Sequence, residues 1–434
     1  VEGIHKYETI KGGLKGIVIG KILTVDKHPD ADRLNLTSVD VGAEDPLQIV
    51  CGAPNVAIGL NVPVATVGTR LYDGDESFKI KRSKIRGQIS NGMICGPDEI
   101  GLGPKTDGIM ELPDDAEVGM AGANYFNINE DIVFEIGLTP NRSDAMSHIG
   151  VARDLKAVLN SRGDDLKMCM PSIKDFKIDN KDLTIDVKIE SESLCPRYSG
   201  VSISNVTVNE SPDWLKHKLL SIGINPINNI VDVTNYVLHE TGQPLHAFDT
   251  EKILGKEIIV KTLSNDTNFI TLDESNRKLS DNDLMICNAK KPMCIAGVFG
   301  GLDSGVTKNT NSIFIESAYF DPTSIRKTAK YHKLNTDASF RYERGCDPNI
   351  TVYALKRAAL LIQELCGGEI SSDVVDVYPN PIEDFSINFS FNNLNKLIGE
   401  ELDRNLVKSI IKNLEIKILE ENDDTLSLLV PPYR

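Results

Sequence analysis

The stretch TGQPLHAFD, residues 241–249, places His246 just after a Gly-Gln-Pro turn, where a turn tip usually carries Ser, Asn or Lys. Ala247 and Phe248 follow at once and are typical of a core. Two interpretations stay open at this point: a packed, hydrogen-bonded core histidine, and a titratable group held in a pocket. The segments on either side of this stretch have to decide between them.

The stretch lies in the largest block of the chain, residues 183–378, which mixes strands and helices. LTIDVKIE at 183–190 alternates and predicts a strand, as do YSGVSISNVTV, EIIVKTL, KPMCIAGVFGG and NSIFIES. SPDWLKHKLLSIG predicts a helix with Ser211 as its cap and Gly223 just past its end, and TVYALKRAALLIQELCGG a second helix that Gly367 ends. Strands and helices do not alternate regularly, so we expect an α+β arrangement. The face of the first helix expected to be buried consists of Trp214, Leu215, Leu219 and Ile222.

Residues 15–120 predict an all-β domain. GIVIGKILTV, LTSVDVG, LQIVCGAPNV, VPVATVG and FKIKRSKIRG are short strands separated by Gly, Pro, Asp and Asn turns. Strands at this spacing suit a small closed barrel such as the OB-fold. The last strand concentrates positive charge, which indicates either an RNA-binding face or a solvated basic face. Its cations are Lys79, Lys81, Arg82, Lys84 and Arg86.

Two further segments predict helices. TPNRSDAMSHIGVARDLKAVLNSRG, within residues 130–163, has Ser143 as its expected N-cap and Gly163 at its end. Residues 385–434 predict strand, helix, strand and strand. The residues expected on the buried faces are Ile149, Ala152, Leu155, Val158 and Leu159 in the first helix, and Leu406, Ile410, Ile411 and Leu414 in the second.

Composition bounds the class of protein. The length of 434 residues suggests roughly three domains. The formal net charge of −16 argues against a non-specific nucleic-acid binder, although local basic clusters can bind one nucleic acid in one orientation. The eight cysteines form no C-x-x-C pair and sit mostly among apolar neighbours, which predicts reduced, buried thiols and no zinc site. In addition to the basic strand at 79–86, the sequence contains a second basic cluster, which consists of Arg326, Lys327, Lys330 and Lys333.

The ends and the hydropathy pattern carry further expectations. No apolar run approaches the about 18–20 residues that span a bilayer. The opening VEGIHKYETI lacks the basic start and apolar core of a secretory signal. It also lacks an initiator Met, and VPPYR ends the chain in an expected strand, so we expect a fragment of a longer protein.

Common enzyme signatures are missing, including a Walker loop, G-x-S-x-G and H-E-x-x-H. AGVFGGLDSG, residues 296–305, lacks the dinucleotide spacing, and its paired glycines indicate either a close backbone approach to a ligand or a tight turn. Glu316 lies inside IFIESAYFDP, which otherwise predicts a strand, and a buried carboxylate needs a partner or a proton. A salt bridge with Arg341 or Arg344 and a ligand-accepting role both stay open.

Six motifs occur in a fixed order: GLTPNRSDA, NNIVDVTNYV, GQPLHAFD, GVFGG, ESAYFDP and TDASFRYERG. With HPDADRL, VCGAPNV and IRGQISNGMICGPDEIGLG in the barrel, they closely resemble the β subunit of bacterial phenylalanyl-tRNA synthetase. The resemblance covers nearly the whole chain and implies a fragment without the extreme N-terminus and the C-terminal half. It implies an α+β multidomain chain: an OB-fold tRNA-binding domain with a short N-terminal strand at 1–127, a helical connecting region at 128–182, a mixed α+β editing domain at 183–380 and a small winged-helix-type domain at 381–434.

The resemblance implies a function shared with a second subunit. The family's α subunit makes the aminoacyl-adenylate with ATP and magnesium, and two α and two β subunits form a cytoplasmic heterotetramer with no membrane role. This fragment is expected to bind tRNA(Phe) and to hydrolyse mischarged Tyr-tRNA(Phe) without a cofactor. The family's magnesium-linked acidic residues lie past position 434, so no metal ligand is expected here.

The resemblance also implies the site residues. His246 matches the pocket histidine, expected to activate or orient water or to bind the amino acid. Glu316 matches the acceptor of the tyrosine phenol, since a carboxylate accepts a charge-assisted O–H···O bond. With Phe bound, the same carboxylate is desolvated and unpaired, at a cost of about 1–3 kcal/mol. Asn335 stands where many relatives carry a basic residue, which puts any contact it makes to the tRNA end in doubt. The other expected substrate-binding residues are Thr234, Asn235, Gly300, Gly301, Thr336 and Ala338.

Two other functions remain as alternatives. One is a non-catalytic module for tRNA binding and subunit assembly with an inactive pocket, and the intact His246, Glu316 and TDA set argues against it. The other is a general acid/base hydrolase of a small ester or sugar, which has no need of the barrel and its basic strand. A requirement for RNA in turnover separates these functions.

Overall fold

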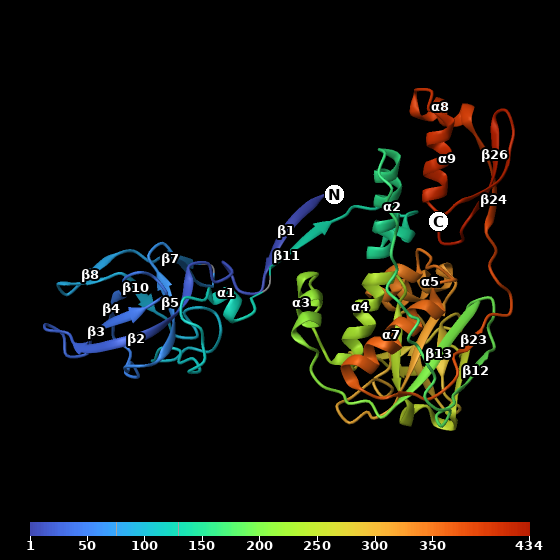
Figure 1. Ribbon diagram of the computed structural model, residues 1–434. Helices are drawn as coiled ribbons and strands as arrows, with labels where there is room; N and C mark the ends of the chain where they lie inside the picture. The colour runs from blue at the N-terminus through green and yellow to red at the C-terminus, as the bar shows by residue number, and fades with distance from the viewer. Residues whose placement is uncertain (75, 129) are drawn as a thin grey trace. The chain divides into compact units, whose positions relative to one another are not determined.

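The computed structural model describes residues 1–74, 76–128 and 130–434, and the chain divides into two compact units, Val1–Ile136 and Gly137–Arg434 (Figure 1). The first unit is almost all strand, whereas the second mixes strands and helices. This mixed content agrees with the α+β class predicted from the sequence. Among the described residues, no helix combines the length and apolar character needed to cross a bilayer.

A five-stranded antiparallel sheet in the order β10-β5-β2-β3-β4 forms the centre of the first unit. Ile17 and Ile19 are buried at alternate positions of β2, as expected for a strand with one face on a core. The two edge strands, β4 and β10, approach each other. The N–H of Asn91, just before β10, donates to the carbonyl oxygen of Gln48 in β4 at 2.8 Å. The sheet is therefore a nearly closed barrel, as its strand spacing predicted. Its strands are β2 Ile17–Lys27, β3 Asn35–Asp40, β4 Leu47–Cys51, β5 Asn61–Thr66 and β10 Gly92–Ile94.

Smaller elements complete the first unit. Two hairpins, β6-β7 and β8-β9, precede β10, and β1 pairs antiparallel with β11. The strand β11 lies in the range 128–182 that was expected to be a helical connection, yet it belongs to the first unit. The bounds are β1 Gly3–Glu8, β6 Arg70–Asp73, β7 Glu76–Lys79, β8 Ser83–Ile85, β9 Gln88–Ser90, α1 Gly122–Tyr125 and β11 Glu130–Glu135.

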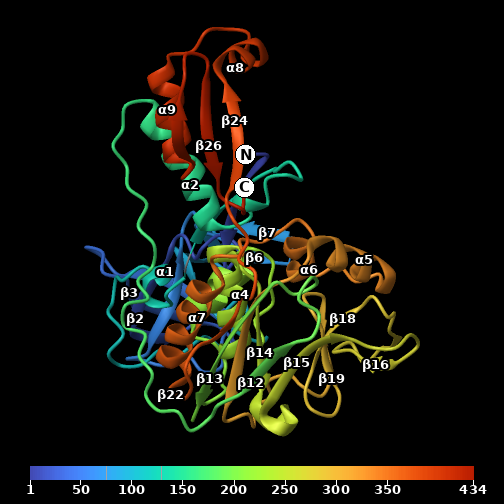
Figure 2. The same cartoon turned by 90° about the vertical axis from the view of Figure 1, so that its right-hand side faces the viewer.

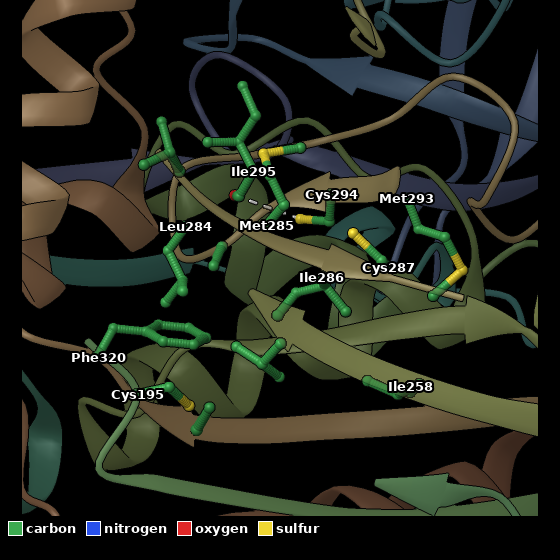
Figure 3. Close-up of a cluster of buried hydrophobic side chains, with 14 of the residues drawn as sticks. Cys195, Ile258, Leu284, Met285, Ile286, Cys287, Met293, Cys294, Ile295 and Phe320 are labelled. Atoms are coloured by element: carbon green, nitrogen blue, oxygen red, sulfur yellow. Dashed lines mark hydrogen bonds between the residues drawn. The ribbon is translucent and has the colours of Figure 1, made fainter. Parts of the chain in front are cut away.

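Two five-stranded sheets form the centre of the second unit, one in the order β12-β15-β18-β19-β20 and the other containing β14-β21-β13-β22, with β23 also paired to β13. Met285 of one sheet and Phe314 of the other belong to a single buried cluster, here named the inter-sheet core. Figure 3 shows the sulfur atoms of Cys195, Cys287 and Cys294 among its aliphatic side chains. The strands are β12 Asp186–Ile189, β13 Arg197–Ser204, β14 Leu245–Asp249, β15 Glu257–Thr262, β18 Leu284–Cys287, β19 Pro292–Ile295, β20 Phe299–Gly300, β21 Ile313–Tyr319, β22 Glu369–Ile370 and β23 Val375–Val377.

The helices α4 and α7 cover the other face of β14-β21-β13, and Val201, Ile315 and Val233 meet there in a second cluster, the helix-side core (Figure 2). The helix α4 begins after Asn228, whose side chain accepts the N–H groups of two residues in its first turn, and ends at Gly242, where φ is 83°. The helix α4 was not predicted from the sequence, although these caps mark both of its ends. The helices of this domain are α3 Asp213–Ser221, α4 Asn229–Thr241, α5 Pro322–His332, α6 Asp337–Tyr342 and α7 Thr351–Cys366.

Several expectations about helix ends and faces are wrong. Ser143 lies in a 3-10 turn, and α2, His148–Ser161, is capped instead by Ser147, whose side chain accepts the Gly150 N–H. Ser211 does not cap α3, because its hydroxyl donates to Asp232 at 2.6 Å. Four side chains expected in the core are exposed: Leu155 at 54%, Val158 at 46%, Trp214 at 41% and Ile222 at 39%.

The last segment holds two helices where the sequence predicted one. Gly399, with φ of 91°, ends α8 before α9 begins, and Val407 and Ile411 are the buried residues of α9. The segment's three strands form an antiparallel sheet in the order β24-β26-β25. The bounds are β24 Phe385–Ser390, α8 Phe391–Ile398, α9 Arg404–Asn413, β25 Lys417–Glu421 and β26 Thr425–Val430.

A buried ionic network joins this segment to the residues around α2. The side chain of Asp144, only 1% exposed, accepts bonds from Arg142 and from Arg434, each at 2.9 Å. Arg153 of α2 donates to Glu415 at 2.9 Å. Because buried charges are tolerated only when paired, Asp144 depends on both arginines.

Candidate active site

Glu316 lies at the centre of the sheet β14-β21-β13, on the face that looks into the inter-sheet core. In the strand register it stands directly opposite His246 of β14 and Gly200 of β13. Directly opposed residues of antiparallel strands share one face of the sheet, so the three lie side by side. The neighbouring positions Ala247 and Ile315 point to the helix-side core. The sheet thus brings together the two residues proposed as catalytic, which are far apart in the sequence.

The carboxylate of Glu316 is 5% exposed and accepts a hydrogen bond at Oε2 from the hydroxyl of the fully buried Tyr198, at 2.8 Å. The two candidate arginines pair elsewhere, Arg341 with Asp337 at 3.4 Å and Arg344 with Glu343. The salt-bridge interpretation is therefore wrong. Burial raises the pKa of Glu316 to about 7, although the bond from Tyr198 acts in the opposite direction.

The imidazole of His246 is half-buried at the start of β14. Its Nε2 atom is buried and has no hydrogen-bond partner among the described residues. The ring meets Phe248 edge to face, with centroids 4.4 Å apart. Burial lowers the pKa of His246 to about 4, so the imidazole is neutral at neutral pH. A neutral imidazole with a free nitrogen can take a proton from water or accept one from a ligand.

The turn before His246 is rigid because a buried glutamine is bonded into it. Gln243 Nε2 donates to the carbonyl oxygens of Pro244 at 3.0 Å and Ala318 at 2.8 Å. The Tyr342 hydroxyl donates to the same two oxygens, at 3.2 and 3.1 Å. These bonds tie the start of β14 to the end of β21, which fixes His246 opposite Glu316.

Of the paired glycines, Gly300 lies beside His246. A Cβ added at Gly300 would lie 3.4 Å from His246 Cε1 and 2.8 Å from Leu272 Cδ1, so a larger residue would crowd the imidazole. A Cβ at Gly301 would instead meet the Met293 carbonyl oxygen at 2.5 Å. Gly301 lines a different cavity, of about 220 Å³, together with Met293 and Phe269. The structure therefore brings only the first of these glycines to the histidine.

Thr336 and Ala338 lie where α6 begins, next to the strand that carries Gly300. The Thr336 side chain caps α6 by accepting the Ser339 N–H, and its hydroxyl lies 3.0 Å from the carbonyl oxygen of Val298, to which it donates. Ala338 packs against the inter-sheet core. Thr336 thus has a structural role in holding α6 beside the loop that leads to Gly300.

Thr234 and Asn235 are not grouped with these residues. Both lie on α4, whose buried apolar side chains belong to the helix-side core. The Thr234 hydroxyl donates to the Val231 carbonyl oxygen of its own helix at 2.7 Å. The sheet therefore separates the apolar face of α4 from the side chains of His246 and Glu316.

The five cations expected to bind RNA lie in the first unit, on the two hairpins β6-β7 and β8-β9 and their connection. All five are exposed, and none forms an ion pair with another described residue. Exposed, unpaired cations on a barrel edge are available to phosphate groups. They are Lys79, Lys81, Arg82, Lys84 and Arg86.

Sequence reasoning missed three polar residues of the site. Tyr198 and Gln243 belong to segments with an ordinary strand or turn pattern, so only the strand pairing reveals their partners. Tyr342 lies in the TDASFRYERG motif, which offered a signal, but its contacts with Pro244 and Ala318 depend on the fold. The prediction of reduced, buried thiols is confirmed for seven of the eight cysteines, which are buried and free. Cys169 is also free but is exposed.

Two parts of the chain match sequence models of known domain families. Residues 194–367 match the "B3/4 domain" and residues 17–121 match the "Putative tRNA binding domain". The first range contains the two-sheet domain with His246 and Glu316, and the second contains the barrel with its basic hairpins. The nearly closed barrel and the mixed domain are therefore each similar to a known domain family.

The similarity to curated proteins extends over the whole chain. It is 55% identical over 432 residues to the phenylalanine–tRNA ligase beta subunit of Bacteroides fragilis (strain YCH46), with 100% of this chain and 53% of that protein covered. It is 56% identical, over the same length and shares, to that of Bacteroides thetaiotaomicron. The chain thus spans about half the length of the curated relatives it matches. A solved N-terminal fragment of the phenylalanyl-tRNA synthetase beta-subunit from Pyrococcus horikoshii is 15% identical, with 68% of this chain and 80% of that chain covered and a TM-score of 0.31.

Proposed function

This chain is homologous over its whole length to phenylalanine–tRNA ligase beta subunits, and on that premise we propose that it forms the tRNA-binding and editing part of such a subunit. In this proposal the two-sheet domain hydrolyses tyrosyl-tRNA(Phe) at Glu316 and His246, and the barrel binds tRNA through its basic hairpins. In the proposed whole enzyme, two such subunits pair with two α subunits in the cytoplasm, and charging uses ATP and magnesium. Residues 381–434 form a winged-helix-type domain in this proposal.

The observation that carries the proposal is the environment of Glu316. This buried carboxyl group accepts a phenolic O–H from Tyr198 at Oε2, and its other oxygen, Oε1, has no hydrogen-bond partner among the described residues. A second phenol can therefore bond to Oε1 in the same manner as Tyr198 bonds to Oε2. The site is chemically suited to a tyrosyl group, and its polarity is unexplained by packing alone.

The preference for tyrosine over phenylalanine follows from the cost of removing water from Glu316 Oε1 without supplying a hydrogen bond. Tyrosine supplies an O–H to Oε1, whereas phenylalanine desolvates the oxygen and supplies nothing. An unsatisfied buried acceptor costs about 1–3 kcal/mol, which corresponds to about a 5- to 150-fold preference for the tyrosyl ester. Discrimination of this size against an isostere that lacks a hydroxyl is what a hydrogen-bonding pocket provides.

His246 supplies the proton transfer that ester hydrolysis needs. A water molecule attacks the aminoacyl carbonyl carbon, His246 Nε2 takes the proton from that water, and the ribose oxygen leaves with the proton returned to it. The low pKa of His246 keeps the imidazole neutral and able to accept a proton at neutral pH. Gly300 keeps one side of the ring open, because a side chain there would lie against Cε1.

The test is hydrolysis of Tyr-tRNA(Phe) and Phe-tRNA(Phe) by the chain and by two variants. We expect preferential release of tyrosine, loss of the preference in Glu316→Ala, and loss of turnover in His246→Ala. If neither the chain nor the complete heterotetramer exceeds spontaneous hydrolysis, the pocket is inactive and the chain serves tRNA binding and assembly instead. Equal turnover of a small tyrosyl ester without any RNA would favour a general hydrolase.

A further inference from the structure

We propose that the exposed face of α5 binds the single-stranded 3′ end of an aminoacyl-tRNA and guides it past Thr336 to the proposed editing site at His246 and Glu316. The inference rests on the proposed editing function, since it assigns the surface that presents the ester to the site. It is carried by the charge, the exposed aromatic ring and the rigid support of α5, and by the direct chain connection from α5 to Thr336.

The two faces of α5 differ completely in character. Ile325, Thr328, Ala329 and His332 are buried and form its inner face. The outer face is basic and carries one aromatic ring, because the side chains of Tyr331 and four cations are exposed. These cations are Arg326, Lys327, Lys330 and Lys333.

The charge of this face contrasts with the charge of the whole chain. The net charge of the chain is −16, yet residues 322–336 contain no Asp or Glu. None of the four cations forms an ion pair within the part of the chain that the structure describes. The flanking acids are both engaged, Asp321 in capping α5 through the Ser324 N–H and Asp337 with Arg341. An uncompensated basic surface on an acidic protein attracts a polyanion locally and repels it elsewhere.

Tyr331 identifies the polyanion as a single strand. It is 60% exposed, and its ring meets the His332 ring edge to face with centroids 4.8 Å apart. Proteins bind single-stranded RNA by combining cations along the backbone with aromatic rings on which bases stack. Binding of an acidic protein partner would need the cations but not an exposed aromatic ring.

The helix is anchored firmly enough to serve as a platform. His332 Nε2 lies 2.7 Å from Asp283 Oδ2, and the Thr328 hydroxyl donates to Asp283 Oδ1 at 2.9 Å. Arg277 donates to the carbonyl oxygen of His332 at 3.0 Å. All of these contacts lie on the inner side of α5. The cations of the outer side take no part in anchoring the helix.

The chain leads directly from this face to Thr336, beside the proposed editing site. Lys333 ends α5 with φ of 55°, and only Leu334 and Asn335 separate it from Thr336. Thr336 in turn is bonded to the carbonyl oxygen of Val298, two residues before Gly300. A strand held along α5 therefore ends next to the residues that flank His246. The basic side chains of α5 can fill the role that Asn335 cannot, because Asn335 carries no charge.

The experiment measures binding of an RNA microhelix with the acceptor stem of tRNA(Phe), with and without its single-stranded 3′ end. We expect Lys327→Glu/Lys330→Glu to weaken binding of the intact microhelix at least about tenfold and to reduce its salt dependence. Tyr331→Ala should weaken it by about 5- to 150-fold, as expected for loss of one stacked base. Removal of the 3′ end should abolish the difference between wild type and variants.

A matched control and a second readout complete the test. The control is Lys167→Glu/Lys174→Glu, which changes two exposed lysines outside both basic surfaces and should leave microhelix binding and its dependence on the 3′ end unchanged. The α5 variants should raise KM for Tyr-tRNA(Phe) while hydrolysis of tyrosyl-adenosine, which has no strand to bind, stays unchanged. If tyrosyl-adenosine and Tyr-tRNA are both stable with wild type, the editing proposal fails, and microhelix binding still tests α5. Equal microhelix affinities for wild type and the α5 variants, or affinity independent of the 3′ end, would overturn the inference and favour an acidic protein partner.

Discussion

The two-sheet domain buries two carboxylate and histidine sets, and they are built differently. Asp283 and His332 are joined directly at 2.7 Å, and Asp283 also accepts bonds from the Thr328 hydroxyl and the Ser280 N–H. Glu316 and His246 face each other across two strands, but Glu316 is bonded to Tyr198, and His246 Nε2 has no partner among the described residues. Both sets pair a buried carboxyl group with a histidine, but His332 is buried, whereas His246 is half-buried.

Their electrostatics diverge accordingly. Burial alone would raise the pKa of Asp283, but the bonds from His332, Ser280 and Thr328 more than offset it, and the pKa is lowered. For Glu316 burial prevails, and the pKa rises to about 7. The comparison shows that burial of polar groups does not by itself make a site. A site is indicated where buried groups keep unused bonding capacity.

The largest expected effect is on stability, at the satisfied pair. His332→Ala removes one partner of a buried pair and leaves Asp283 without its main donor, which should lower the free energy of unfolding by about 3–5 kcal/mol. His246→Ala breaks no hydrogen bond at Nε2 and should cost much less. Denaturant unfolding of both variants checks this, with Lys330→Ala as an exposed control. Equal losses for the two histidines would remove the distinction between the sets.

Gly200 tests how tightly the sheet is built around Glu316. A Cβ at this position would overlap the ring of Phe314, so Gly200→Ala overpacks the inter-sheet core and should cost about 1–3 kcal/mol of stability. Gly163→Ala is a useful contrast, because nothing lies within 4 Å of a Cβ there, although its φ of 105° disfavours a side chain. Thermal unfolding reports both changes. A neutral Gly200→Ala would mean that Phe314 can move away from β13.

Tyr198→Phe should sharpen the role of the open carboxylate. The variant keeps the ring but removes the O–H that lowers the pKa of Glu316, so this pKa should rise further above about 7. The preference for Tyr-tRNA over Phe-tRNA at neutral pH should fall by about tenfold, the size of one hydrogen bond to a charged group. Paired hydrolysis assays measure it. An unchanged preference would show that Tyr198 serves only packing.

The last expected effects concern pH, where the two sets should respond in opposite directions. A raised pKa means that Glu316 favours the folded state at low pH, and this contribution is lost as pH rises from its ordinary value near 4.5 through about 7. A lowered pKa means that Asp283 contributes stability above its ordinary value of 3.8 and loses it as pH falls further. Unfolding at several pH values, in wild type, Glu316→Gln and Asp283→Asn, separates the two slopes.

The sequence predicted elements better than it predicted contacts. Alternating strands such as 183–190, the barrel, and the helix that ends at Gly367 could be derived because periodicity and caps are local signals. The buried faces of α2 and α3 could not, because burial of Leu155 or Trp214 depends on which neighbour packs there. The resemblance singled out His246 and Glu316, but their cross-strand register and the bond from Tyr198 exist only in the folded sheet.

The ionic network around Asp144 has a consequence for the timing of synthesis. Asp144 and Arg434 are separated by 290 residues. At about 5–20 residues per second, the ribosome makes Arg434 roughly 15–60 s after Asp144. Throughout that interval the carboxylate lacks one of its two arginines, and the intervening two-sheet domain, which ends with β23 at Val377, is completed before Arg434 is made. We therefore expect the segment around α2 to settle only after Arg434 has been made, and a nascent chain interrupted before that point to expose this segment to proteases.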